Sequence, residues 1–184
     1  MDSERLHTMK ERAESVQAVV SHVRDMSEVI RYTIDLMHKQ EGSVLAAPGL
    51  SDHDQVFLWK ECEAEAIQLL TSPLRNHLSE IHTSLTYADC GIAETGTLVL
   101  DSSSEDIRIA TMLAETHIAV LSASQIYADA VSLEEELTIL QKSPPRYMAF
   151  ITGPSRTADI ERVLTIGVHG PQELHILIME ETEK

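Results

Sequence analysis

The chain has 184 residues, of which 43% are hydrophobic and 24% are charged, so it is long enough for one globular domain with a sizeable core. Its formal net charge of −16 argues against nucleic-acid binding, because contacts with phosphates need clustered Lys and Arg. No run of about 18 apolar residues occurs, which argues against an ordinary membrane-spanning helix.

The first residues and the cysteines bear on location and cofactors. Residues 1–5 are charged and lack an apolar stretch, so we expect no secretory signal and a cytoplasmic protein. The chain has two cysteines, Cys62 and Cys90, which form no CxxC pair. They cannot supply the four thiolates that an iron–sulfur cluster usually takes, and two free thiols are expected rather than a disulfide. We therefore expect no redox cofactor bound by this chain.

An amphipathic helix is predicted at the N-terminus. Apolar residues recur at steps of three and four from Leu6 to Val23, with charged residues between them. The pattern favours a helix packed against its own domain. The alternative is an arm for a homodimer or for partner docking, since two and a half heptads are too few to indicate a coiled coil.

The next elements alternate between helix and strand. Ser27 is predicted to cap a second amphipathic helix that ends near Gly42. Residues 43–47 form a short apolar run and predict a buried strand, and Ser51 is expected to cap the following helix. Residues 66–70 fit either the end of that helix or another strand.

The second half of the chain is richer in predicted strands. Residues 92–94 and 96–100 indicate paired or bent strands, with glycines easing the backbone. The remaining expected elements are a helix over 106–113, a strand over 118–121, a helix carrying Leu133, Leu137 and Leu140, a strand over 148–151, a helix starting near Arg156, and a strand over 174–179.

Helices that alternate with short apolar strands predict an α/β fold, namely a three-layer sandwich with a mostly parallel, mixed sheet and additional N-terminal helices. Residues 1–42 are expected to form a helical segment packed on the domain, and residues 43–184 the α/β domain itself. The chain is thus expected to be a single domain overall.

Three segments carry candidate chemistry, and the first is GIAETGTLVL over residues 91–100. It places Glu94 between glycines in an otherwise apolar stretch, where a ligand or another backbone can approach closely. A carboxylate at such a point can act as a base, a nucleophile or a ligand anchor, with Gly96 and Thr97 contacting the ligand. The alternative is that Glu94 only caps a bulge or pairs with an arginine.

The second segment is TGPSRTADIE over residues 152–161. A strand, a Gly-Pro turn and hydroxyl residues ahead of a predicted helix would expose backbone N–H groups to an anion, with Arg156 offering a bidentate guanidinium. The alternative is an ordinary helix cap with Arg156 paired to a nearby carboxylate. The candidate ligand-binding residues of this segment are Thr152, Gly153, Ser155, Arg156 and Thr157.

The third segment is GVHGPQELH over residues 167–175. His169 lies close to two glycines, which makes it accessible, and histidine titrates near neutral pH, so it is a second candidate catalytic residue beside Glu94. A turn histidine that bonds only to backbone is the commoner outcome. The histidines show no HExxH or HxxH spacing, so no metal site is expected.

Together the three segments resemble the signature of the LUD-domain family, and their order and spacing match its lactate-utilisation protein C branch. The resemblance covers roughly residues 84–180 and extends to HIAV at 117–120, although Glu115-Thr116 stands where the family often has a proline. It implies a fold similar to the NagB/RpiA/CoA-transferase α/β sandwich. It also implies a role in lactate utilisation beside two cysteine-rich iron–sulfur partner proteins, which would carry the clusters.

Two functions from different classes follow. The leading hypothesis is a non-redox subunit of an L-lactate-oxidising complex that binds a small anionic ligand or organises the assembly. The alternative is a stand-alone transferase or isomerase acting on a CoA ester or sugar phosphate through Glu94, by fold-level analogy with the acidic nucleophile of CoA transferases. A scaffold with a vestigial pocket is a third possibility. Under the leading hypothesis, the Glu94 turn and the Thr152–Thr157 turn converge on one pocket.

Overall fold

The computed structural model describes residues 3–134, 138, 147–157, 165–166 and 170–180. Four α-helices, three short 3-10 helices and twelve strands are assigned within these residues. Their bounds in chain order are α1 Ser3–Ser15, β1 Val19–Val23, α2 Met26–Lys39, β2 Val44–Ala46, α3 Asp52–Ala64, β3 Gln68–Leu70, η1 Leu74–His77, β4 Thr83–Ala88, β5 Cys90–Ile92, η2 Ala93–Thr95, β6 Thr97–Asp101, α4 Glu105–Leu113, β7 Thr116–Ser122, η3 Ala123–Gln125, β8 Ile126–Tyr127, β9 Met148–Ile151, β10 Arg156–Thr157, β11 Thr165–Ile166 and β12 Glu173–Met179.

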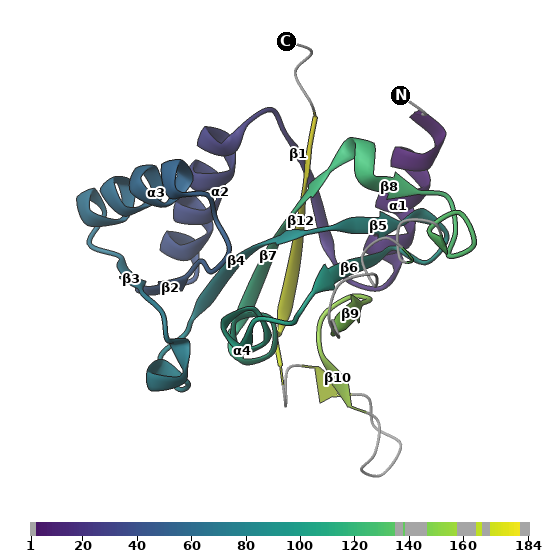
Figure 1. The fold of residues 1–184 in the computed structure, drawn as a ribbon. Helices are drawn as coiled ribbons and strands as arrows, with labels where there is room; N and C mark the ends of the chain where they lie inside the picture. The colour runs from purple at the N-terminus through teal and green to yellow at the C-terminus, as the bar shows by residue number, and fades with distance from the viewer. Residues whose placement is uncertain (1–2, 135–137, 139–146, 158–164, 167–169, 181–184) are drawn as a thin grey trace.

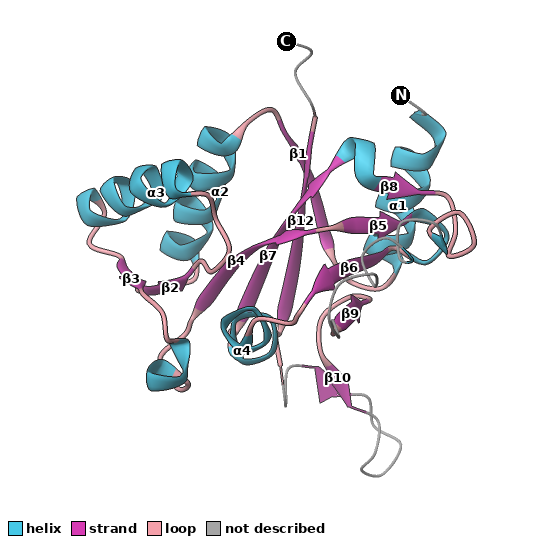
Figure 2. Cartoon of the chain, in the orientation of Figure 1, coloured by secondary structure: helices cyan, strands magenta, loops and turns pink. Residues whose placement is uncertain are grey.

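A six-stranded sheet in the order β1-β12-β7-β4-β2-β3 forms the middle layer, and all of its pairings are parallel. Figures 1 and 2 show α2 and α3 on one side of this sheet and α1 with a second, smaller sheet on the other. Its central strands are buried on both faces, as parallel strands covered by two layers are expected to be. The expected α/β fold with a mostly parallel sheet is confirmed.

The second sheet has the order β8-β5-β6-β9 and contains both antiparallel and parallel pairs. It is built from the continuations of the central strands, because β4 leads through Asp89 into β5 and β7 leads through η3 into β8. The pairing expected for residues 92–94 and 96–100 is confirmed as β5 with β6, but the first strand ends at Ile92, and Ala93–Thr95 form the turn η2 instead.

The N-terminal helix is shorter than the apolar pattern predicted. It ends at Ser15, and Gln17 takes a left-handed φ of 71°, which turns the chain into β1. The sequence VVSHV of β1 is rich in β-branched residues that favour a strand, and Val20 pairs with Ile176 of β12. Residues 1–42 thus supply an edge strand of the main sheet as well as two helices.

The helix caps agree with the sequence in one case and differ in another. Ser51 caps α3, as predicted, and accepts a hydrogen bond from the Asp54 N–H. The predicted cap Ser27 is wrong, because Asp25 caps α2 by accepting from the Glu28 N–H. Ser27 lies inside the first turn, where its hydroxyl donates to the Asp25 carboxylate.

Two predictions concern the region after β8. The helix expected around Leu133, Leu137 and Leu140 falls mainly outside the described residues. The helix expected to start near Arg156 is wrong at its first residues, since Arg156–Thr157 is a strand paired antiparallel with Thr165–Ile166. A hydrogen-bonded partner strand has overridden the local capping pattern. In the part of the chain that the structure describes, no helix is long and apolar enough to cross a membrane.

Candidate functional site

The Glu94 turn is a close backbone contact rather than a cradle for a ligand. Gly96 has a φ of 63°, and a Cβ there would lie 2.3 Å from the Ala13 backbone nitrogen of α1. The Glu94 side chain is exposed, and its backbone N–H donates to the Ala128 carbonyl over 2.9 Å. The glycines could allow either a ligand or another backbone to approach, and the structure shows the backbone of the last turn of α1 in this place.

The first two motif segments do lie side by side. Strands β6 and β9 are antiparallel neighbours, with Leu98 opposite Ile151. The Thr97 hydroxyl is buried and lies 2.7 Å from the Thr95 hydroxyl and 2.7 Å from the Thr152 hydroxyl. A chain of three hydroxyls thus joins the two turns, although Glu94 itself takes no part in it.

Arg156 is engaged with the N-terminal segment. Because Arg156 lies on β10, the anion site that a helix start would have offered is not formed at this residue. Its guanidinium donates instead to the Val16 carbonyl, the oxygen that a Cβ on Gly153 would approach to 2.3 Å. Glycine at 153 thus allows the Val16 carbonyl to approach, and Arg156 binds that carbonyl just after the end of α1.

Residues of the same loop also line a cavity between α4 and β9. Its volume is about 340 Å³, within the range of small-molecule sites. Thr152, Gly153 and Ser155 line it, whereas Glu94, Gly96, Thr97, Arg156 and Thr157 are not among its lining residues. The other lining residues are Ser102, Arg108, Thr111, Met112, His117, Ala149, Phe150, Ile151, Gly170, Pro171 and Leu174.

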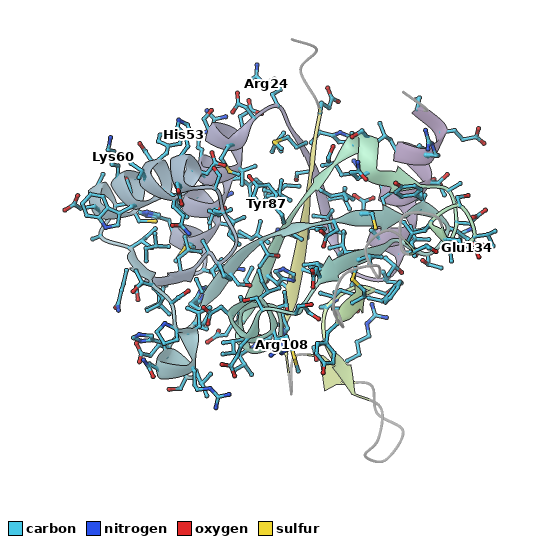
Figure 3. The ribbon with its side chains drawn as sticks, in the orientation of Figure 1. Arg24, His53, Lys60, Tyr87, Arg108 and Glu134 are labelled. Atoms are coloured by element: carbon cyan, nitrogen blue, oxygen red, sulfur yellow. The ribbon has the colours of Figure 1, made fainter. Side chains whose placement is uncertain are left out.

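The charge of this cavity comes from Arg108. No carboxylate is found among the described lining residues, although the chain as a whole carries a net charge of −16. The Arg108 guanidinium is fixed by hydrogen bonds from Nη1 to the Ser102 carbonyl (2.5 Å) and the Ser103 carbonyl (2.9 Å). It also lies 5.9 Å from the centre of the Tyr147 ring. Figure 3 labels Arg108 beside α4. A positioned cation in an otherwise acidic protein suits an anion.

His117 supplies the second functional group of the cavity. It lies near the start of β7 on the face that Ala119 and Leu121 also occupy, and it is 1% exposed. Burial lowers the pKa of His117 to about 4, so the ring is neutral at neutral pH. Its Nε2 lies 2.9 Å from the Thr86 hydroxyl, and Nδ1 has no hydrogen-bond partner among the described residues. Nδ1 is thus the ring nitrogen left for a ligand.

The third segment divides between the two faces of the sheet. His169 lies outside the described residues, while Gly170 and Pro171 line the cavity. On the opposite face, His175 bonds through Nδ1 to the Tyr32 hydroxyl (2.8 Å) and through Nε2 to Glu173 (2.9 Å). Because Tyr32 belongs to α2, this second part of the segment fixes α2 on the sheet.

Sequence reasoning did not single out Arg108 or His117 as site residues. A signal for His117 was present in the sequence. In a strand, His117 shares one face with the apolar residues Ala119 and Leu121, so a polar ring is placed on a face that is otherwise apolar. Arg108, Thr111 and Met112 share one face of α4 by helical spacing. Nothing in the local sequence indicates that this face borders β9, which comes 35 or more residues later.

Comparison with known proteins assigns nearly the whole chain to one family. The family model described as LUD domain matches residues 6–179. A lactate utilization protein C of Macrococcus caseolyticus is 30% identical over 136 residues, which cover 72% of this chain and 55% of that protein. The uncharacterized protein YkgG of Escherichia coli is 37% identical over 102 residues, 53% of this chain and 43% of that protein. The chain thus spans about half the length of these curated relatives.

A solved structure supports the fold. A DUF162 family protein from Deinococcus radiodurans superposes with a TM-score of 0.63 over 96% of this chain and 97% of that one. The two sequences are 21% identical, so this likeness concerns the fold alone.

Proposed function

The chain belongs to the LUD-domain family, and from this premise we propose that it is a cytoplasmic subunit of an L-lactate-utilisation system that binds a small carboxylate. Relatives named lactate utilization protein C support a role in lactate utilisation, and the cavity between α4 and β9 supports the binding of a small carboxylate. The single observation that carries the ligand class is Arg108, the positioned cation in a cavity without a described carboxylate.

A 2-hydroxy or 2-oxo acid matches the groups of this cavity. Its carboxylate would pair with Arg108, and its hydroxyl or carbonyl oxygen would bond to Nδ1 of His117. The Thr86 hydroxyl beside Nε2 can donate or accept, so Nδ1 can accept from a hydroxyl or donate to a carbonyl. The short apolar end would pack on Met112 and Ile151. Thr152 and Ser155 would add hydroxyl contacts from the loop that Arg156 fixes to the Val16 carbonyl.

The low pKa of His117 favours binding over proton abstraction. A histidine whose pKa is about 4 is a weak base at neutral pH, where an efficient general base has a pKa near 7. We therefore assign His117 a hydrogen-bonding role and place the oxidation of lactate in the partner proteins. The alternative transferase or isomerase reaction through Glu94 gains no support from the cavity, because Glu94 is not among its lining residues.

The proposal assigns iron–sulfur clusters to the partner proteins rather than to this chain. A cluster usually takes four thiolates, and the chain has only Cys62 and Cys90. Both side chains are buried, and burial raises the pKa of Cys62 to about 11, which keeps its thiol protonated. Co-purification with the cysteine-rich products of neighbouring reading frames tests this half, and a tagged chain that retains neither of them would contradict it.

Titration calorimetry tests the ligand half. We expect pyruvate or L-lactate to bind the wild-type protein and Arg108→Gln to weaken the affinity at least tenfold, in line with the loss of a charge-assisted hydrogen bond. Arg75→Gln is the matched control. Arg75 pairs with Glu105, which lies on α4 as Arg108 does, but Arg75 does not line the cavity. Equal affinity in the Arg108 variant would reject the site.

A further inference from the structure

Helix α3 has a second apolar face that the core does not use. Leu58 and Cys62 face the core and are 0% and 1% exposed, whereas Val56 and Trp59 are 55% and 53% exposed. Val56 and Trp59 share their face with Asp52 and Gln55, because these four residues follow the i, i+3, i+4, i+7 spacing of one helical stripe. Val56 and Trp59 therefore form an apolar patch on α3 that does not pack on the core.

This stripe forms one wall of a second cavity, remote in sequence from the first. The cavity measures about 550 Å³ and is also lined by Ala47 and Pro48 after β2 and by Thr71 and Ser72 after β3. Both segments follow the carboxyl ends of parallel strands, the place where open α/β sheets bind their ligands. Its floor is apolar, being formed by Leu58, Leu69, Leu70 and Leu74.

The charge of this second cavity is opposite to that of the first. Asp52 is the one ionisable group among its described lining residues, which include no Lys, Arg or His. The basic residues of α3, His53 and Lys60, lie on another face of the helix (Figure 3). The face of a tryptophan ring attracts cations, and a carboxylate nearby adds to that attraction.

We propose that the cavity between α3 and the ends of β2 and β3 binds a small organic cation, an amine or quaternary ammonium compound with an apolar body. The charged end would lie between Asp52 and the Trp59 ring, and the apolar body would cover the leucine floor. This site is independent of the proposed carboxylate site, so either can fail without the other. A second copy of this chain is a poorer occupant, because each copy carries a net charge of −16.

Three probes with similar rings and different charges test the proposal: benzyltrimethylammonium, benzyl alcohol and benzoate. Trp59 is the only tryptophan, so its single indole N–H resonance reports binding at this cavity directly. We expect the cation to bind about tenfold more tightly than the alcohol, and benzoate more weakly than either. Equal affinities for the cation and the alcohol, a preference for benzoate, or no binding of any probe would overturn the proposal.

Two variants and two controls locate the effect. Asp52→Asn should remove most of the preference for the cation, and Trp59→Leu, followed by calorimetry, should abolish it. Glu63→Gln removes the same charge from an exposed position of α3, and Arg108→Gln alters the other cavity; both should leave the cation affinity unchanged. Loss of the preference in Glu63→Gln would show a general charge effect. Dimerisation that shifts the Trp59 resonance and disappears in Val56→Asp would assign the face to a second copy.

Discussion

The guanidinium of Arg156 holds the backbone carbonyl of Val16, 140 residues earlier in the chain. The contact is made where α1 has ended and the chain turns toward β1. The loop that carries Arg156 presents Thr152, Gly153 and Ser155 to the carboxylate cavity. The N-terminal segment therefore supports one wall of the proposed site.

Arg156→Ala tests this supporting role. We expect the free energy of unfolding to fall by about 1 kcal/mol, the scale of an exposed hydrogen bond from a charged group. We expect pyruvate affinity to fall less than in Arg108→Gln. Urea unfolding and calorimetry on both variants make the comparison, and a larger loss of affinity in Arg156→Ala would restore Arg156 as the anion ligand.

Alanine substitutions at Gly96 and Gly49 test the close contact between the Gly96 turn and α1, with Gly49 as the control. Both have positive φ, 63° and 83°, so alanine is strained at either position. A Cβ at 96 would lie 2.3 Å from the Ala13 nitrogen, whereas at 49 it would meet only the flexible end of Ile107 at 3.2 Å. Gly49→Ala should lower the free energy of unfolding by about 1 kcal/mol, and Gly96→Ala by about 3 kcal/mol or more. Similar values in urea unfolding would refute the backbone contact.

Elements with strong local signals were predictable from the sequence. The Ser51 cap, the strand at 44–46 and the turn between β5 and β6 are each encoded by a few neighbouring residues. The helix predicted to run to Val23 was wrong, because VVSHV satisfies a helical stripe and a β-strand alike. Only the pairing of Val20 with Ile176, far along the chain, decides between them.

The candidate site was predictable only in part. The loop with Thr152, Gly153 and Ser155 was indicated by its Gly-Pro turn, and it lines the cavity. Arg156 was assigned to a helix start because the hydrogen-bonded partner at Thr165–Ile166 leaves no local mark. Arg108 and His117 come from a helix and a strand that meet only in the folded chain, so spacing along the sequence could not join them.

The buried His117 makes a prediction for the pH dependence of stability. Its pKa is about 4 in the folded protein against an ordinary value of 6.5, so between these values the unfolded chain binds a proton that the folded protein does not. Stability should therefore fall as the pH drops from about 6.5 to about 4, by on the order of 2–3 kcal/mol from this group. His117→Asn should lose this part of the dependence while keeping that of the carboxylates. Parallel curves for both proteins in urea unfolding would contradict the assignment.

Ser84, the register neighbour of His117 on β4, offers a test of buried polarity. Its hydroxyl is the buried side-chain polar atom that has no hydrogen-bond partner within the described residues. Ser84→Ala should raise the free energy of unfolding by about 1 kcal/mol, because it removes an unsatisfied polar group. Thr86→Val removes a hydroxyl that is paired with His117, so it should lower stability instead. A destabilised Ser84→Ala protein would show that the hydroxyl does have a partner.

The most direct test of the proposed carboxylate site is a crystal structure of the protein with bound pyruvate or L-lactate. The account predicts the ligand carboxylate against the Arg108 guanidinium and its second oxygen at Nδ1 of His117, inside the cavity between α4 and β9. A ligand seated instead at the Glu94 turn or on Arg156, or an empty cavity at a ligand concentration that saturates binding in solution, would contradict it.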